Sequence, residues 1–185
     1  MTRRKASVAE RRAERADVDD PAVVLEAALR FLEARARSEA EVRRRLTQAG
    51  YRSELVDGAI TRLAELGVLD DEAFARAWVE SRDRARPRGE RALRRELSLK
   101  GIDRGVLDEV MEERRDAAGD DGTNVDLEAA RRLLARNARS LERVADPRTR
   151  RQRAYALLAR NGFDPDVCRE ASRELGAEID EAEPD

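Results

Sequence analysis

A run of arginines in the middle of the chain is the sequence feature that most clearly indicates a binding site. It surrounds a turn marked by Pro87 and Gly89. Guanidinium groups make bidentate contacts with carboxylates and phosphates, so a turn followed by a helix start can present several of them to one phosphate strand or one acidic protein groove. Arg91 and Arg95, one helical turn apart, should share a face. The run comprises Arg82, Arg84, Arg86, Arg88, Arg91, Arg94 and Arg95.

Comparable arginine groups occur earlier and later in the chain. The stretch from Arg131 to Arg160 carries ten Lys or Arg against two Asp or Glu, a balance of +8, although the whole chain has a net charge of only −2. Recurrence favours a binding surface, and the alternative is an ordinary solvated helix surface. The further candidates are Arg43, Arg44 and the adjacent Arg45 in the first part of the chain, and Arg148, Arg150, Arg151 and Arg153 in the last.

Catalytic chemistry has little support in the residue types. Asp70 and Asp71 could serve acid–base or metal chemistry, but acids where a helix begins are explained by capping of free amides and by the helix dipole. The chain has no His, and its single Cys168 occupies an apolar position typical of a buried structural thiol. No glycine-rich phosphate loop or Cys/His ligand set occurs. We therefore predict no enzyme activity, no metal and no cofactor.

The composition indicates which elements must position the arginines. Charged residues make up 42% of the chain, hydrophobic residues 41% and aromatic residues only 3%. Ala, Arg, Glu and Leu are strong helix formers, and strand-like alternation is rare. The sequence predicts an all-α protein with a thin aliphatic core, which suits elongated helical repeats better than one large globule.

An internal repeat supports this fold. Alignment on Gly50, Gly101 and Gly162 brings five apolar columns into register, as expected for a helix that ends in a left-handed glycine turn, an apolar residue that folds back, and a second helix. Together with a helix before each pair, this predicts three tandem three-helix repeats in an elongated, curved molecule. The columns are Val42, Leu93 and Ala154; Leu46, Leu97 and Leu158; Tyr51, Ile102 and Phe163; Leu55, Val106 and Val167; and Val56, Leu107 and Cys168.

Local signals predict the boundaries of these parts. We expect helix starts at Pro21 after Asp20, at Ser38 with Glu41 in a capping box, and at Ser53 as a cap. Trp78 is expected on an apolar face with Phe74, and the first helix of the third repeat should run from about Asp126 to Leu141. The predicted division is a disordered arm at 1–20, repeats at 21–67, 68–115 and 125–177, a flexible linker at 116–124, and an acidic tail at 178–185.

The central segment resembles the RecX family. The resemblance lies in Gly67-Val68-Leu69-Asp70-Asp71-Glu72-Ala73-Phe74-Ala75, in Trp78-Val79-Glu80-Ser81-Arg82, in Arg88-Gly89, in Arg94-Arg95-Glu96-Leu97 and in Lys100-Gly101-Ile102. Residues from Arg37 to Tyr51 are similar to the family's first repeat, and Arg160-Asn161-Gly162-Phe163 resembles the third. The resemblance covers roughly residues 22–175. It implies three tandem three-helix repeats and a protein that binds along the groove of the RecA–DNA filament and modulates, usually inhibits, ATP hydrolysis and strand exchange.

Two other functions remain open from the residues alone. A helical-repeat nucleic-acid binder that acts without RecA would use the same arginines, because they serve phosphate equally well. A generic protein scaffold would bind neither DNA nor RecA. The partners expected from the resemblance are the RecA filament and single- or double-stranded DNA, contacted by a monomer. Since the chain shows no signal peptide and no membrane-spanning apolar run, we expect a cytoplasmic location without membrane contact.

Overall fold

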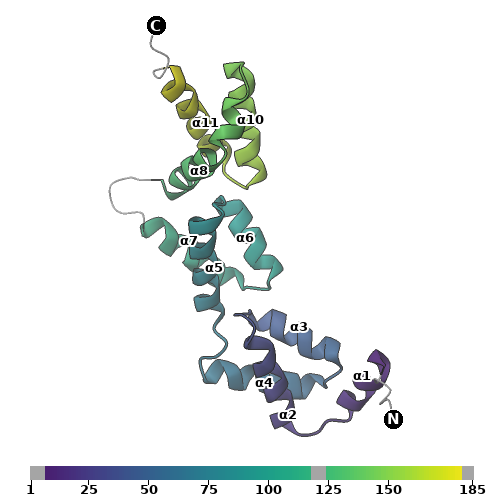
Figure 1. Ribbon diagram of the computed structural model, residues 1–185. Coiled ribbons are helices and arrows are strands. Elements are labelled where there is room, and N and C mark those ends of the chain that lie inside the picture. The colour runs from purple at the N-terminus through teal and green to yellow at the C-terminus, as the bar shows by residue number, and fades with distance from the viewer. Residues whose placement is uncertain (1–6, 118–123, 181–185) are drawn as a thin grey trace. The chain divides into compact units, whose positions relative to one another are not determined.

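The computed structural model describes residues 7–117 and 124–180 (Figure 1). These residues form helices and no strand, so the prediction of an all-α fold is confirmed. In chain order the helices are α1 (Val8–Ala16), α2 (Pro21–Leu32), α3 (Glu39–Ala49), α4 (Ser53–Glu65), α5 (Asp71–Ala85), α6 (Glu90–Leu99), α7 (Arg104–Asp116), α8 (Val125–Arg136), α9 (Ala138–Glu142), α10 (Pro147–Arg160) and α11 (Pro165–Asp180).

Helices α2 to α4, α5 to α7, and α8 to α11 form three modules, which we call the first, second and third module. Contacts group the chain into two compact units. The first unit extends to Phe74 and includes Lys100–Ile102, and the second comprises Ala75–Leu99 and everything from Asp103 onward. Part of the second module therefore packs with the first module, a division that the repeat pattern did not predict.

The first module buries the apolar positions that the helical periodicity selects. Val24 and Ala28 of α2 are fully enclosed, and α3 contributes Val42 and Leu46 to the same core. From α4 the core receives Val56, Ala59, Ile60 and Leu63. Because these residues recur every three or four positions, each helix turns one aliphatic stripe inward.

In the second module the buried face of α5 differs from the predicted one. Ala75 and Val79 are buried, whereas Phe74 and Trp78 are only half-buried and Ala77 is exposed. The two aromatic rings lie at the margin, where Arg82 lies over the Trp78 ring and Lys100 over the Phe74 ring. The buried apolar residues of α6 and α7 are Leu93, Leu97, Leu107, Val110 and Met111.

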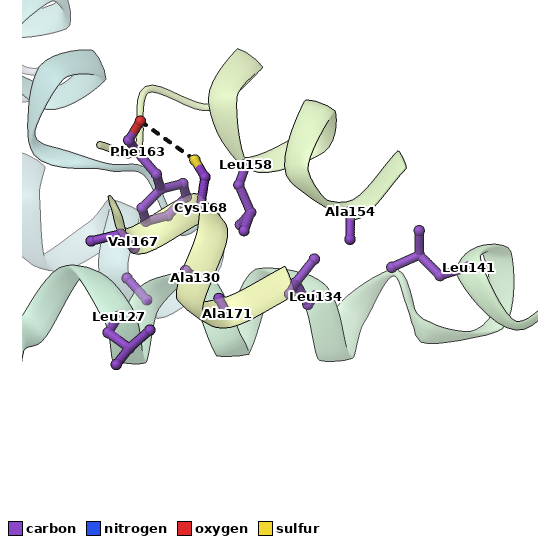
Figure 2. Close-up of a cluster of buried hydrophobic side chains, with 11 residues drawn as sticks. Leu127, Ala130, Leu134, Leu141, Ala154, Leu158, Phe163, Val167, Cys168 and Ala171 are labelled. Atoms are coloured by element: carbon purple, nitrogen blue, oxygen red, sulfur yellow. Dashed lines mark hydrogen bonds between the residues drawn. The ribbon is translucent and has the colours of Figure 1, made fainter. Parts of the chain in front are cut away.

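The third module has its own core between α8, α10 and α11 (Figure 2). Leu134 and Leu158 are buried there, together with Phe163 from the turn that connects α10 to α11. Cys168 is fully enclosed, with Sγ 3.6 Å from the carbonyl oxygen of Phe163, and burial raises the pKa of its thiol. The buried position predicted for this residue is confirmed.

The three aligned glycines end the middle helix of each module in a left-handed conformation. Gly50, Gly101 and Gly162 have φ values of 108°, 83° and 83°, which only glycine adopts without strain. At Gly162 the amide donates to the Ala159 carbonyl at 3.1 Å, and the Phe163 amide donates to the Leu158 carbonyl at 3.3 Å. These are the hydrogen bonds of the expected glycine cap.

Two of these glycine turns also join successive modules. A β-carbon on Gly101 would lie 2.3 Å from the β-carbon of Ala40 on α3, and one on Gly162 would lie 2.4 Å from the β-carbon of Ala92 on α6. Both helices therefore rest against the glycine turn of the module that follows. We call each such contact a module joint.

A carboxylate completes each module joint. Asp71 accepts the Glu39 amide of α3 at 2.9 Å, and Asp126 accepts the Glu90 amide of α6 at 3.0 Å. In each case an acid at the start of one module satisfies a free amide at the beginning of a helix in the preceding module. The first joint also contains Lys100, whose Nζ lies 3.2 Å from Glu41.

The carboxyl group of Asp71 predicts a measurable pH effect. Burial raises the pKa of Asp71 despite the hydrogen bond from Glu39, with Asp70 and Glu41 adding repulsion. The ionised form is therefore disfavoured in the folded state, and this cost is present above both the folded and unfolded pKa values and absent below them. Asp71→Asn keeps an oxygen acceptor and should raise the unfolding free energy at neutral pH. Urea titrations should show this gain disappearing at acid pH, and an equal gain at both pH values would contradict the explanation.

A buried arginine links three helices of the second unit. The Arg114 side chain is only 5% exposed, and it binds Asp83 of α5 through Nε at 2.9 Å and Asp126 of α8 through a terminal nitrogen at 2.7 Å. Burial lowers the pKa of Arg114, but the hydrogen bonds to the two carboxylates outweigh this effect and raise it. The second and third modules are thus connected by the same carboxylate, Asp126, that completes their joint.

Several boundary predictions need correction. The arm predicted at 1–20 to be disordered contains α1, because Ser7 and Glu10 form a capping box; residues 1–6 lie outside the described part. Ser53 is the first residue of α4, and Arg52 holds the cap position without a side-chain bond. The helix expected to reach Leu141 breaks at Asn137, whose side chain donates to the Leu133 carbonyl at 2.8 Å.

The predicted linker and tail are shorter than expected within the described residues. Asp116 belongs to α7, and Asn124 is the N-cap of α8, where it accepts amides of Asp126 and Leu127. Residues 118–123 lie outside the described part of the chain. At the other end, α11 continues to Asp180 and so includes the beginning of the predicted tail. Residues 181–185 are also not described.

Candidate partner-binding surface

The arginines of the first module lie on α3. Arg43 is paired with Asp57 of α4, while the neighbouring Arg44 is exposed. Arg45 lies with its guanidinium carbon 5.7 Å from the centre of the Phe31 ring. Of these three, Arg44 is the side chain most available to a partner.

Two arginines of the central run converge on one carboxylate. Glu96 of α6 accepts Nε of Arg82 at 2.7 Å and lies 3.6 Å from Nε of Arg88. It also accepts the indole N–H of Trp78 at 2.9 Å, and the Arg82 guanidinium lies 4.3 Å above the indole ring. Arg88 binds the side chain of Asn161 as well. Trp78 is therefore part of a polar cluster at the edge of the core, with its ring half-buried.

Trp78 is the single tryptophan of the chain, so its fluorescence reports on this cluster. Glu96→Ala should release Arg82 and the indole N–H together, because both depend on the same carboxylate. We expect a red-shifted emission maximum and stronger acrylamide quenching of Trp78. Glu109→Ala, at an exposed position of α7, is the control and should leave both properties unchanged. Unaltered quenching in Glu96→Ala would mean that Glu96 does not hold the cluster.

The next three arginines, on α6, have different surroundings. Arg94 binds Glu90 at 2.7 Å and Asp108 at 2.5 Å, and these hydrogen bonds outweigh the effect of burial and raise its pKa. Arg91 pairs with Asp164 at 2.8 Å at an exposed position, where an ion pair contributes little. Arg95 is exposed, and it has no ion pair with any described residue.

Arg84 and Arg86 lie at the end of α5, where the backbone makes a contact that the sequence did not predict. Both side chains are exposed. Arg136 of α8 donates to the backbone carbonyls of Arg84, at 2.7 Å, and of Ala85. These are carbonyls that a helix end leaves without an internal partner, so Arg136 caps α5 from another module. The Arg136 guanidinium thus lies against the backbone of the segment that carries Arg84 and Arg86.

In the third module the arginines of α10 divide between its two sides. Arg148 and Arg151, three residues apart, are exposed neighbours on the helix surface. Arg150 instead donates through Nε to the Val144 carbonyl at 3.0 Å. Arg153 lines a cavity of about 340 Å³ together with Arg160, which the sequence analysis did not single out.

Six of the predicted site residues thus have protein partners, namely Arg43, Arg82, Arg88, Arg91, Arg94 and Arg150. One of these pairs was predictable from the sequence, because Glu90 precedes Arg94 by one helical turn. Within the described chain the remaining candidates are exposed and make no ion pair. They are Arg44, Arg84, Arg86, Arg95, Arg148, Arg151 and Arg153, which we call the open arginines.

Comparison with known proteins places this chain in a family. Residues 25–63, 70–111 and 124–171 match the models of the first, second and third three-helix domains of RecX. A regulatory protein RecX from Mycobacterium avium (strain 104) is 34% identical over 151 residues, which cover 81% of this chain and 83% of that protein. The chain belongs to the RecX family. Another relative, from Mycobacterium sp. (strain JLS), is 39% identical over 76% of this chain and 74% of its own.

Solved structures of the family share this fold. The crystal structure of RecX from Lactobacillus salivarius matches with a TM-score of 0.71 at 21% identity and covers 86% of this chain and 98% of its own. A second RecX crystal structure has a TM-score of 0.64 at 21% identity, over 86% of this chain and 70% of the other. Three three-helix domains, predicted from the glycine alignment, are therefore confirmed as the family's architecture.

Neither a membrane-spanning helix nor a metal-binding cluster occurs among the residues that the structure describes. No helix among them is both long and apolar enough to pass through a lipid bilayer. They also contain no group of three His, Cys, Asp or Glu side chains arranged to hold a metal ion. The acids Asp70 and Asp71 serve the backbone instead: Asp70 accepts the Ala73 amide at 2.8 Å, and Asp71 accepts the amide of Glu39.

Proposed function

We propose that this RecX-family protein is a cytoplasmic regulator that binds the RecA–DNA filament as a monomer and inhibits its ATP hydrolysis and strand exchange in recombinational repair. Family membership supports regulation, and the open arginines support the mode of binding. Seven exposed guanidiniums distributed over three modules suit a long anionic partner better than a compact one. The protein acts by occupancy, and we assign it no catalytic residue and no cofactor.

The observation that carries the binding mode is the separation of the arginines into paired and open groups. Arg94 donates hydrogen bonds to Glu90 and Asp108, so it stabilises the second module. Arg95, one residue later, is exposed. Open arginines meet RecA carboxylates or DNA phosphates, and the bound modules oppose the filament changes that accompany nucleotide turnover or pairing with a second duplex.

The test measures DNA-dependent ATP hydrolysis and strand exchange by RecA at increasing concentrations of this protein. We expect both activities to fall near stoichiometric amounts. Absence of any effect there would reject the proposed regulation. A pull-down with RecA–DNA–nucleotide filaments, compared with RecA alone and DNA alone, identifies which assembly is recognised.

Charge reversal of open arginines tests the surface itself. Arg95→Glu combined with Arg148→Glu should weaken filament binding by about tenfold or more, because each change removes a charge-assisted contact and adds repulsion. Arg132 and Arg173 are exposed but lie outside the candidate set, so their double reversal is the matched control. Circular dichroism should show unchanged helix content in both variants. Equal loss of binding in both would exclude the proposed surface.

A second candidate is direct nucleic-acid binding without RecA, favoured by Arg153 and Arg160, which line the same 340 Å³ cavity. Titration of bare DNA at several salt concentrations distinguishes the two functions. Tight binding with a steep salt dependence in the absence of RecA would favour this candidate. Weak binding that becomes tight when RecA is added would favour the filament regulator.

A further inference from the structure

The cavity between α1 and the first module has an unusual lining. Its volume is about 450 Å³, within the roughly 300–1,000 Å³ typical of small-ligand sites. Three helices contribute arginines to it, and none of the described residues that line it is acidic. The arginines are Arg11, Arg12 and Arg15 from α1, Arg30 from α2 and Arg45 from α3.

The contacts of Arg15, Arg30 and Arg45 leave most of their positive charge in place. Arg15 donates to the Ala49 carbonyl at 3.4 Å and lies 5.8 Å from the centre of the Tyr51 ring, and Arg45 lies against Phe31. Such contacts orient a guanidinium without neutralising it. Arg30 is paired with Glu26, but both side chains are more than 60% exposed, where an ion pair contributes little.

Helix α1 is positioned like the helices at the two module joints. A β-carbon on Gly50 would lie 2.6 Å from the carbonyl oxygen of Arg12, so α1 crosses this glycine turn as α3 crosses Gly101 and α6 crosses Gly162. Ser7 and Glu10 even repeat the capping box of Ser38 and Glu41. Helix α1 therefore packs on the glycine turn of the first module in the way that α3 and α6 pack on the glycine turns of the modules that follow them.

The α1 contact lacks the stabilising parts of the other two joints. No residue of α1 is buried, and Val8 is 75% exposed. Asp71 and Asp126 supply a carboxylate to the other joints, whereas the described lining of the α1 cavity carries only positive charge. Like charges facing one another across a cavity repel, so a counter-ion would strengthen the docking of α1.

We infer that this cavity binds a ligand with two or more closely spaced phosphate groups, which bridges α1 to α2 and α3. Guanidinium forks match the oxygens of phosphate, and arginines from three helices can surround several such groups at once. The phosphates could belong to a nucleotide or to the backbone of a nucleic-acid strand. This site uses none of the open arginines and requires no RecA, so it goes beyond the proposed regulation.

Calorimetric titration of the full chain with tripolyphosphate at low ionic strength tests the site. Arg12→Gln combined with Arg45→Gln should weaken binding by about tenfold or more, because two charged donors are lost. Arg132→Gln with Arg173→Gln removes the same charge elsewhere and should bind like the parent. Absence of tripolyphosphate binding, or equal weakening in both variants, would overturn the inference.

Competition identifies the source of the phosphates. Displacement of tripolyphosphate by ATP but not by a short oligothymidine indicates a free nucleotide, and displacement by the oligothymidine indicates a nucleic-acid backbone. Trypsin provides a readout of α1 itself, since it cleaves after Arg11, Arg12 and Arg15. Bound tripolyphosphate should slow these cleavages in the parent protein. Unchanged cleavage at saturating ligand would contradict the bridging role of α1.

Discussion

Replacing Arg114 by Ala should lower the unfolding free energy by about 3–5 kcal/mol, the range for removing one partner of a buried ion pair. The guanidinium is 5% exposed and binds both Asp83 and Asp126. Its loss leaves two carboxylates without their shared cation. Asp126 also accepts the Glu90 amide, so the joint between the second and third modules should weaken as well. Urea titration followed by circular dichroism measures the change.

The adjacent residue supplies the control for this prediction. Arg115 is half exposed and makes longer contacts, 3.5 Å to Glu90 and 3.4 Å to Glu112. Arg115→Ala should therefore cost less than about 1 kcal/mol. A double-mutant cycle with Asp83→Asn isolates the Arg114–Asp83 interaction. Similar costs for the two arginine substitutions would show that burial does not decide the outcome.

Gly89→Ala should destabilise the second unit by about 3 kcal/mol or more, at the upper end of overpacking effects. A β-carbon at this position would lie 2.4 Å from the carbonyl oxygen of Gly162 and 2.4 Å from Cα of Phe163. Backbone atoms cannot move aside as a flexible side chain can. The hydrogen bond from the Gly89 amide to the Asn161 carbonyl, 3.1 Å long, holds the two segments together and should be strained. Thermal unfolding measures the loss.

Gly58 offers a control of opposite sign. It lies inside α4, and a β-carbon there would meet no atom within 4 Å. Gly58→Ala should therefore raise the unfolding free energy by about 0.5–1 kcal/mol, because alanine favours helix and restricts the unfolded chain. A gain in stability at Gly58 together with a large loss at Gly89 would show that steric clash, and not the backbone preference of alanine, causes the loss at Gly89. Equal and small effects would argue against the close approach at Gly89.

The fold was predictable where periodicity and turn chemistry agree. Leu46, Leu97 and Leu158 occupy equivalent columns and are all buried, and the glycines that follow them have the expected positive φ. The sequence could not reveal the orientation of α5, since Trp78 carries both an apolar ring and a polar N–H. Glu96 of α6 accepts that N–H, and this contact depends on tertiary structure, whereas Arg82 lies one turn further along the same helix as Trp78.

The sequence predicted which arginines belong to the candidate surface, but it did not predict which of them are paired within the protein. Every arginine of the central run looks alike in sequence, yet Arg82, Arg88 and Arg94 have carboxylate partners, two of which are distant along the chain. Asp108 lies 14 positions from Arg94, a separation that no helical spacing rule connects. The sequence also missed α1, because a nine-residue helix without a buried side chain leaves no hydrophobic pattern.

The contact of Ala40 with Gly101, and that of Ala92 with Gly162, has a consequence for sequence variation. Each pair sets an alanine against a glycine with a positive φ of 83°, so the two residues cannot exchange places without backbone strain even though they differ by only one methyl group. Compensatory exchange is therefore blocked at both pairs. In an alignment of relatives these positions should stay nearly constant and should produce no covariation signal, although the two residues of each pair are in close contact.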